Sequence, residues 1–188
     1  MPPDAPITTD HAVAHERAMR DLVEPFYTPL ERLGSLTPVG EGELEPDYRA
    51  LLAHDDHMTV TQEALHESLV DVRVVDERSG DGWYSRASVL ARQSDGRAVQ
   101  LGVMRINLGG LPSAVREAIE ARKTPLGRIL IRHHLLREVE LLALWRIEAG
   151  PGLAEALGIN EGDTTYGRSA RILVEGKPVV ELLEIVRP

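Results

Sequence analysis

The 188-residue sequence contains no cysteine, and this excludes disulfide-stapled folds, thiol nucleophiles, cysteine-based zinc sites and iron–sulfur clusters. No stretch approaches the ~18 consecutive apolar residues that a membrane-spanning helix needs. The N-terminus also lacks the basic-then-apolar order of a signal peptide. We therefore expect a cytoplasmic protein with no membrane partner.

Basic residues are fewer than acidic ones, with 21 Lys and Arg against 30 Asp and Glu and a formal net charge of −9. The average field of such a chain repels nucleic acid, so we expect no nucleic-acid partner. An anionic ligand would have to be held by individually placed arginines. The length and the 43% share of hydrophobic residues predict one folded domain with a single core.

Familiar catalytic motifs are also missing. The sequence has no Gly-x-Ser-x-Gly elbow, no phosphate-binding glycine loop and no dinucleotide fingerprint. Two histidine groups, His54-Asp55-Asp56-His57 and His133-His134, suggest a metal only weakly. Adjacent residues in an extended segment point to opposite faces, so His133 and His134 cannot both bind one ion, and we expect no metal site.

The first 50 residues predict a helical N-terminal extension and a loop. Apolar spacing indicates a helix within His11–Leu33 that Pro25 ends or kinks. The stretch Leu36–Asp47 is rich in Gly and Pro and predicts a loop, and a short helix is expected at Tyr48–His54.

Residues 51–188 predict the main domain, within one structural unit overall. Segments rich in Val, Leu and Thr predict six strands, at Met58–Asp76, Gly82–Arg92, Ala98–Asn107, Leu136–Ile147, Thr164–Val174 and Pro178–Val186. Turns at 79–82, 94–96 and 175–177 predict three antiparallel hairpins, and helices are expected at Pro112–Lys123 and Pro151–Leu157, with Gly158 as C-cap. The predicted fold is α+β, with one antiparallel sheet of about six strands and helices packed on it.

Two arginines occupy unusual places in the predicted strands. Arg105 shares a face with Val99, Leu101 and Val103, and Arg86 lies among polar residues that resemble a pocket wall. Arginine stays charged, so a buried guanidinium needs an anion, from either a protein carboxylate or a ligand. An ordinary salt bridge is the alternative for each.

Two glutamates, Glu181 and Glu184, interrupt the nearly continuous apolar run of the last strand. Burial should raise the pKa of at least one of them and favour a neutral, proton-donating acid. Pairing with Arg168 or Arg171 across the hairpin is the alternative. Upstream, Pro125 and Gly127 flank Leu126, whose backbone N–H could meet an anion, although a plain connector to the next extended segment explains the same residues.

Several motifs, in order, resemble the chorismate lyase family, over roughly Leu51 to Pro188. They are Leu51-Leu52 with Met58-Thr59, then Trp83-Tyr84-Ser85-Arg86, then Lys123-Thr124-Pro125-Leu126-Gly127-Arg128, and finally Gly167-Arg168, Gly176-Lys177-Pro178 and Glu184-Ile185-Val186-Arg187-Pro188. The resemblance implies a lyase that eliminates pyruvate from chorismate to give 4-hydroxybenzoate, without a cofactor.

The same resemblance implies the roles of single residues. Met58 would line the site, Arg86 would bind a substrate carboxylate, and Leu126 would add a backbone contact. Glu184 would donate a proton to the ether oxygen, with Glu181 as its rival. Arg105, displaced from the family position, would be the second cation for a small, dianionic substrate.

Other functions fit the same residues. The superfamily also contains domains of transcription regulators that sense small molecules, here an aromatic carboxylate, without converting them. A related lyase acting on another enol-ether carboxylate is a third reading. The sequence is compatible with a monomer or a homodimer.

Overall fold

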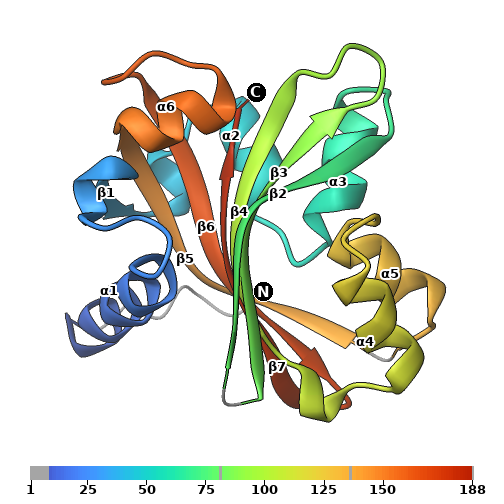
Figure 1. The fold of residues 1–188 in the computed structure, drawn as a ribbon. Helices are drawn as coiled ribbons and strands as arrows, with labels where there is room; N and C mark the ends of the chain where they lie inside the picture. The colour runs from blue at the N-terminus through green and yellow to red at the C-terminus, as the bar shows by residue number, and fades with distance from the viewer. Residues whose placement is uncertain (1–8, 81, 136, 188) are drawn as a thin grey trace.

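One antiparallel sheet of seven strands organises the chain, with the order β1-β5-β6-β7-β4-β3-β2. The structure is a computed structural model that describes residues 9–80, 82–135 and 137–187 (Figure 1). The predicted α+β class with a single antiparallel sheet is therefore confirmed, with seven strands in place of six. No helix in these ranges is long and apolar enough to span a membrane.

Seven strands and six α-helices make up the described part of the chain. The strands are β1 (Gly34–Val39), β2 (Val70–Gly80), β3 (Trp83–Arg92), β4 (Ala98–Asn107), β5 (Arg137–Ala149), β6 (Thr164–Val174) and β7 (Lys177–Val186). The α-helices are α1 (Thr9–Val23), α2 (Pro46–Leu52), α3 (Met58–Leu65), α4 (Ser113–Glu120), α5 (Leu126–Arg132) and α6 (Pro151–Leu157). Short 3-10 helices lie at Leu30–Arg32, Glu41–Glu43 and Leu108–Gly110.

Helices cover both faces of the sheet (Figure 1). Helices α1 and α6 pack on one face, where Met19 and Leu153 join a core around Trp145. Helices α2, α3, α4 and α5 pack on the other, where Ile119 and Leu130 are fully buried. We call these the α1/α6 face and the α3/α5 face. Because both are covered, a polar group on the sheet is buried unless the covering layer leaves a space.

The three predicted hairpins are confirmed. They join β2 to β3, β3 to β4 and β6 to β7, although Asp81 of the first turn lies outside the described residues. The predicted C-cap at Gly158 is also confirmed, since that residue has φ 62° and ends α6 in the left-handed conformation that glycine adopts readily.

Two segments differ from the prediction. Met58–Leu65 is helix α3 rather than the start of a strand, because Met58, Thr59 and Gln62 bury one helical face against the sheet. The predicted loop at 36–47 contains the end of β1, which pairs with β5 as an edge strand and so tolerates Pro38. Residues 34–39 therefore belong to the sheet and not to an extension of it. Leu136, the predicted start of the fourth strand, lies outside the described residues.

Candidate functional site

A small, partly enclosed cavity lies between the α3/α5 face of the sheet and helices α3 and α5. Its polar lining comes from Arg86 and Ser88 of β3, Gln100 of β4 and Glu184 of β7. Its other lining residues are His57, Met58, Thr59, Val72, Leu90, Gly102, Val103, Met104, Pro125, Leu126, Gly127, Ile172 and Leu182. The space open to a water molecule is about 50 Å³, enough for a few waters.

Strand register brings the polar residues together. Arg86 pairs with Met104, and Ser88 pairs with Gly102, which pairs in turn with Glu184. Directly opposed residues in an antiparallel sheet share a face, so Arg86, Ser88 and Glu184 all point to the α3/α5 side. Gly102 has no side chain between the last two, and this leaves part of the space.

Helices α3 and α5 form the roof of the cavity and meet at Gly127. A Cβ atom there would lie 3.0 Å from Thr59 Oγ1 and 3.3 Å from the Cβ of His57, so a side chain at this position would have to push its neighbours away by a few tenths of an ångström. Met58 and Leu126 line the cavity from these helices, as the family resemblance implied. Leu126 begins α5 rather than an extended segment, and its amide belongs to a first helical turn that has no intrahelical acceptor.

Arg86 is the least satisfied charged group of the site. Its side chain is fully buried, and none of its three guanidinium nitrogens has a hydrogen-bond partner among the described residues. Burial lowers the pKa of Arg86, an effect that the nearby Tyr84 phenol and Glu77 carboxylate partly offset. Tyr84 donates its own hydrogen to Glu77 at 2.8 Å, and Arg122 also pairs with Glu77. The buried guanidinium therefore faces the cavity without a hydrogen-bonded anion.

Glu184 is already paired. Its Oε2 accepts a hydrogen bond from Arg168 Nε at 2.8 Å, and its Oε1 accepts one from Gln100 Nε2 at 3.2 Å. This confirms the alternative expectation of an Arg168 partner across the hairpin. Both carboxylate oxygens therefore accept hydrogen bonds, one of them from a buried guanidinium, where the sequence led us to expect an unpaired acid.

Arg168 links the cavity to the segment between α2 and α3. It is 1% exposed, and besides Glu184 it donates to the backbone oxygens of His54, at 2.7 Å, and Asp56, at 2.9 Å. The sequence offered Arg168 only as a salt-bridge partner, and its role in fastening this segment was missed. Gln100, whose Oε1 is buried without a hydrogen-bond partner, was also missed, since one glutamine in an apolar strand gives little signal.

His54 is held as a neutral ring by its neighbours. Its Nδ1 accepts from the amide of Asp56 at 3.1 Å and lies 3.3 Å from Arg168 Nη1, while its Nε2 lies 2.7 Å from the carbonyl of Leu51. These contacts assign the proton to Nε2. Burial lowers the pKa of His54, and the positive charge of Arg168 lowers it further.

We expect acid to destabilise the fold through His54. Its pKa is below the ordinary 6.5 in the folded chain, so the unfolded chain binds more protons as pH falls below that value. The stability contribution is therefore complete above about pH 6.5 and is lost on acidification. Thermal unfolding from about pH 7.5 to about pH 5 should show a smaller decline for His54→Asn than for the wild type.

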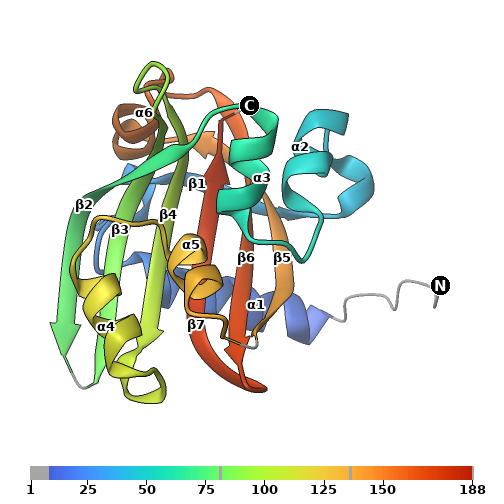
Figure 2. The ribbon, with the colours of Figure 1, turned by 90° about the vertical axis from the view of Figure 1, so that its right-hand side faces the viewer.

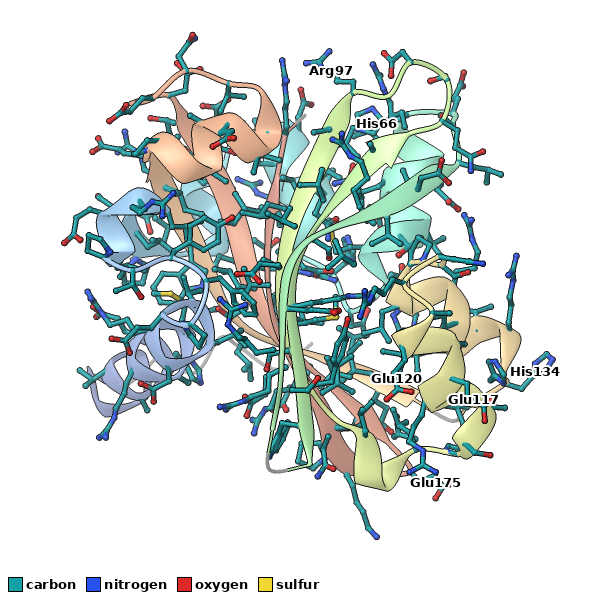
Figure 3. All side chains as sticks on the ribbon, viewed as in Figure 1. His66, Arg97, Glu117, Glu120, His134 and Glu175 are labelled. Carbon is teal, nitrogen blue, oxygen red and sulfur yellow. The ribbon has the colours of Figure 1, made fainter. Side chains whose placement is uncertain are left out.

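A second histidine and a control refine this measurement. The pKa of His66 is also lowered, first by burial and then by Arg92 and Arg97, and Figure 3 shows His66 and Arg97 at the same end of the sheet. His66→Asn should act in the same direction. His133→Asn, at an exposed position, should leave the pH profile unchanged, and an unchanged profile for His54→Asn as well would contradict the assignment.

Arg105 and Glu181 lie on the other side of the sheet. They are opposed in the register of β4 and β7, next to Met104 and Leu182, so they point to the α1/α6 side. Arg105 Nε donates to Glu181 Oε2 at 2.9 Å, and its guanidinium lies 5.2 Å from the centre of the Trp83 ring. The expectation that Arg105 and Arg86 converge on one ligand is wrong, and Glu181 is not a rival of Glu184 in this cavity.

The histidine groups do not assemble a metal site. No cluster of three or more metal-ligating His, Asp or Glu side chains occurs within residues 9–80, 82–135 and 137–187. His134 is exposed beyond the end of α5, at the periphery of the molecule (Figure 3). His54 instead belongs to the network around Arg168.

Comparison with known proteins adds solved structures of regulators. The ligand-binding domain of a GntR-family transcriptional regulator from Bordetella bronchiseptica is 14% identical, with 63% of this chain and 85% of that one covered and a TM-score of 0.47. The C-terminal domain of the histidine utilization repressor from Pseudomonas syringae is 15% identical, with coverages of 62% and 90% and a TM-score of 0.44. The possible transcriptional regulator YydK from Bacillus subtilis is 14% identical, with 95% of this chain and 82% of that one covered and a TM-score of 0.48. No family model matches the chain, and no curated protein does.

The prediction of a carbon–oxygen lyase is corrected. The similar structures are described as regulators or their domains, not as enzymes. The cavity itself also lacks the chemistry that the lyase reading required. Only one of the two expected arginines faces it, and the expected acid is an acceptor in an ion pair. The expectations of a dianionic chorismate substrate and of pyruvate release depended on the lyase prediction and are withdrawn with it.

Proposed function

We propose that this chain is a binding module that holds a small organic anion in the cavity under α3 and α5 without converting it. The buried, unpartnered guanidinium of Arg86 is the observation that carries this proposal. A buried charge without a partner is unfavourable, and a guanidinium binds a carboxylate through two parallel hydrogen bonds. An anionic guest would satisfy the group that the protein leaves unsatisfied.

Charge balance favours a monoanion as the guest. Arg168 neutralises Glu184, so Arg86 contributes the uncompensated positive charge of the lining. Met58, Met104 and Leu182 supply apolar contacts beside it. The Oε1 of Gln100 and the paired carboxylate of Glu184 are acceptors, which suit a hydroxyl or amino group on the guest. The ligand class is therefore a small monocarboxylate with an apolar body and one hydrogen-bond donor.

The biological role that we propose is effector sensing in transcriptional regulation. The Bordetella structure carries the description of a ligand-binding domain of a regulator, and binding without turnover is the chemistry of such a domain. This role agrees with a cavity lining that has a cationic anchor in Arg86, an acceptor in Gln100 and a carboxylate, Glu184, that is already paired with Arg168.

A panel of aromatic and aliphatic hydroxy-carboxylates tests the proposal by thermal shift and calorimetry. A bound monocarboxylate should raise the unfolding temperature of the wild type in proportion to its concentration relative to Kd. Arg86→Met should weaken that binding by about tenfold or more, because it removes charge-assisted hydrogen bonds. Arg105→Met, on the opposite face, is the matched control and should bind like the wild type.

The result that would overturn the proposal is equally direct. If no member of the panel shifts the unfolding temperature, or if Arg86→Met binds as tightly as the wild type, the anion site is wrong. Incubation with chorismate should release no pyruvate. If the wild type releases pyruvate and Arg86→Met does not, the site is catalytic and the proposal of binding without conversion is wrong.

A further inference from the structure

Strand β2 forms one edge of the sheet and has no partner strand on its outer side within the described ranges (Figure 2). It is 11 residues long and pairs only with β3. Such an edge exposes backbone N–H and C=O groups that can pair with another strand. Natural proteins usually protect it with charged residues, and β2 carries several of them.

Four of these charges lie on one face of the strand. Asp71, Arg73, Asp76 and Arg78 pair with Ala91, Val89, Ala87 and Ser85 of β3, respectively, and these four partners alternate along β3. All four charged residues therefore point to the α1/α6 side, where their signs alternate. We call Asp71, Arg73, Asp76 and Arg78 the charge ladder.

A β-bulge in β2 places all four charged side chains on the same face of the strand. Arg73 and Asp76 are three residues apart and would point to opposite faces of a regular strand. The register of β2 shifts between Val74 and Asp76, which inserts Val75 as an extra residue and returns Asp76 to the face of Arg73. Val75 itself is 59% exposed at the centre of the ladder.

The ladder is complementary to itself. If a second copy of β2 is turned antiparallel, its signs run in the reverse order, so that each Asp faces an Arg. Asp71 then faces Arg78 of the partner subunit, and Arg73 faces Asp76 of the partner subunit. Both strands carry two residues between Arg73 and Asp76, so bulge lies opposite bulge and the register is kept. In this register Val74 of one copy faces Val75 of the other copy across the two-fold axis.

We propose that this chain forms a symmetric dimer by antiparallel pairing of β2 with β2, which joins two seven-stranded sheets edge to edge. Charges that would protect the edge against other strands favour a second copy, because an antiparallel copy in this register places all four charges opposite charges of the other sign. These side chains have contacts within the chain that a partner strand would replace: Asp71 accepts a hydrogen bond from Gln93 Nε2 at 2.7 Å, and the Arg78 guanidinium lies 5.5 Å from the centre of the Phe26 ring. Arg78 and Asp76 pair with each other within the strand, but their side chains are 52% and 43% exposed.

The neighbouring surface leaves room for a partner. Arg73, Val75 and Asp76 line an open groove on the α1/α6 side, bordered by Phe26 of the segment after α1 and by Ala156 of α6. The groove lets a second strand approach the ladder without displacing a helix. Exposed ion pairs are screened by salt, so the dimer should weaken as ionic strength rises.

Sedimentation velocity of the whole chain over a range of concentrations at low salt tests the pairing by charge reversal. The wild type should sediment as a dimer at high concentration. Arg73→Asp and Asp76→Arg should each shift it toward monomer by tenfold or more in dissociation constant, because each places like charges across the two-fold. The double variant Arg73→Asp/Asp76→Arg restores opposite signs and should restore the dimer. Arg146→Asp, an exposed arginine of β5 near the other edge, is the matched control and should stay dimeric.

Three outcomes would overturn the proposal. They are a wild type that is monomeric at every concentration, single reversals that leave the dimer intact, and a double variant that is as monomeric as either single one. The ligand plays no part in this measurement, so its result is separate from that for the anion site. Circular dichroism of each variant identifies any loss of fold.

Discussion

Replacing Arg86 by methionine should raise the free energy of unfolding of the ligand-free chain by about 1–4 kcal/mol. The guanidinium is fully buried and has no hydrogen-bond partner among the described residues, whereas a methionine side chain would pack against Met104 and Leu182. The gain should appear in urea titrations. It should also raise the unfolding temperature by about 2–4 °C per kcal/mol for a chain of this size.

A gain in stability together with a loss of binding is what separates an anion site from a structural arginine. Arg86→Lys, which keeps a buried charge, is the comparison and should show no such gain. If Arg86→Met were less stable than the wild type, the guanidinium would be contributing to the fold, and the argument for a guest anion would lose its basis.

Replacing Arg168 by methionine should have the opposite effect, a loss of about 3–5 kcal/mol. The substitution removes the ion pair with Glu184 and two hydrogen bonds to the segment between α2 and α3, and it leaves a largely buried carboxylate without its cation. Urea unfolding of Arg168→Met against the wild type measures the loss directly.

Arg171 offers a matched control on the same strand. It pairs with Glu140, but these side chains are 39% and 49% exposed, and such pairs contribute less than about 1 kcal/mol. Arg171→Met should therefore be close to the wild type. Equal losses for Arg168→Met and Arg171→Met would show that the buried network is not the source of the effect.

The alternation of side chains along each strand predicted which residues share a face of the sheet, but it does not show which face borders the cavity. It placed Arg105 with Leu101 and Val103, and the structure keeps these residues on one face. That face is the α1/α6 face, which the cavity does not adjoin. The same ambiguity left Glu181 and Glu184 undecided, because two residues three apart in a strand lie on opposite sides and the sequence does not say which side has space.

Local composition was misleading where packing determined the structure. The Val and Thr residues of Met58–Leu65 favour a strand, yet the segment is a helix because its buried face covers the sheet. The Gly and Pro residues of Leu36–Asp47 favour a loop, yet the first part of this stretch, with Pro38, lies in the edge strand β1, where proline is tolerated. Four residues named from the sequence line the cavity: strand alternation and the family resemblance indicated Arg86 and Glu184, the flanking Pro125 and Gly127 and the resemblance indicated Leu126, and the resemblance alone indicated Met58. The lyase function that this resemblance implied disagrees with the cavity, where only one of the two expected arginines is present and Glu184 is ion-paired.

The close contact at Gly127 has a kinetic consequence. Gly127 of α5 packs there directly against the side chains of His57 and Thr59, over an interior with room for only a few waters. Because the space holds only a few waters, a guest with an apolar body needs the two helices to separate before it can enter or leave. Opening of this contact would then set the rate of exchange, so we expect association well below the diffusion limit and a long residence time even for a guest of modest affinity.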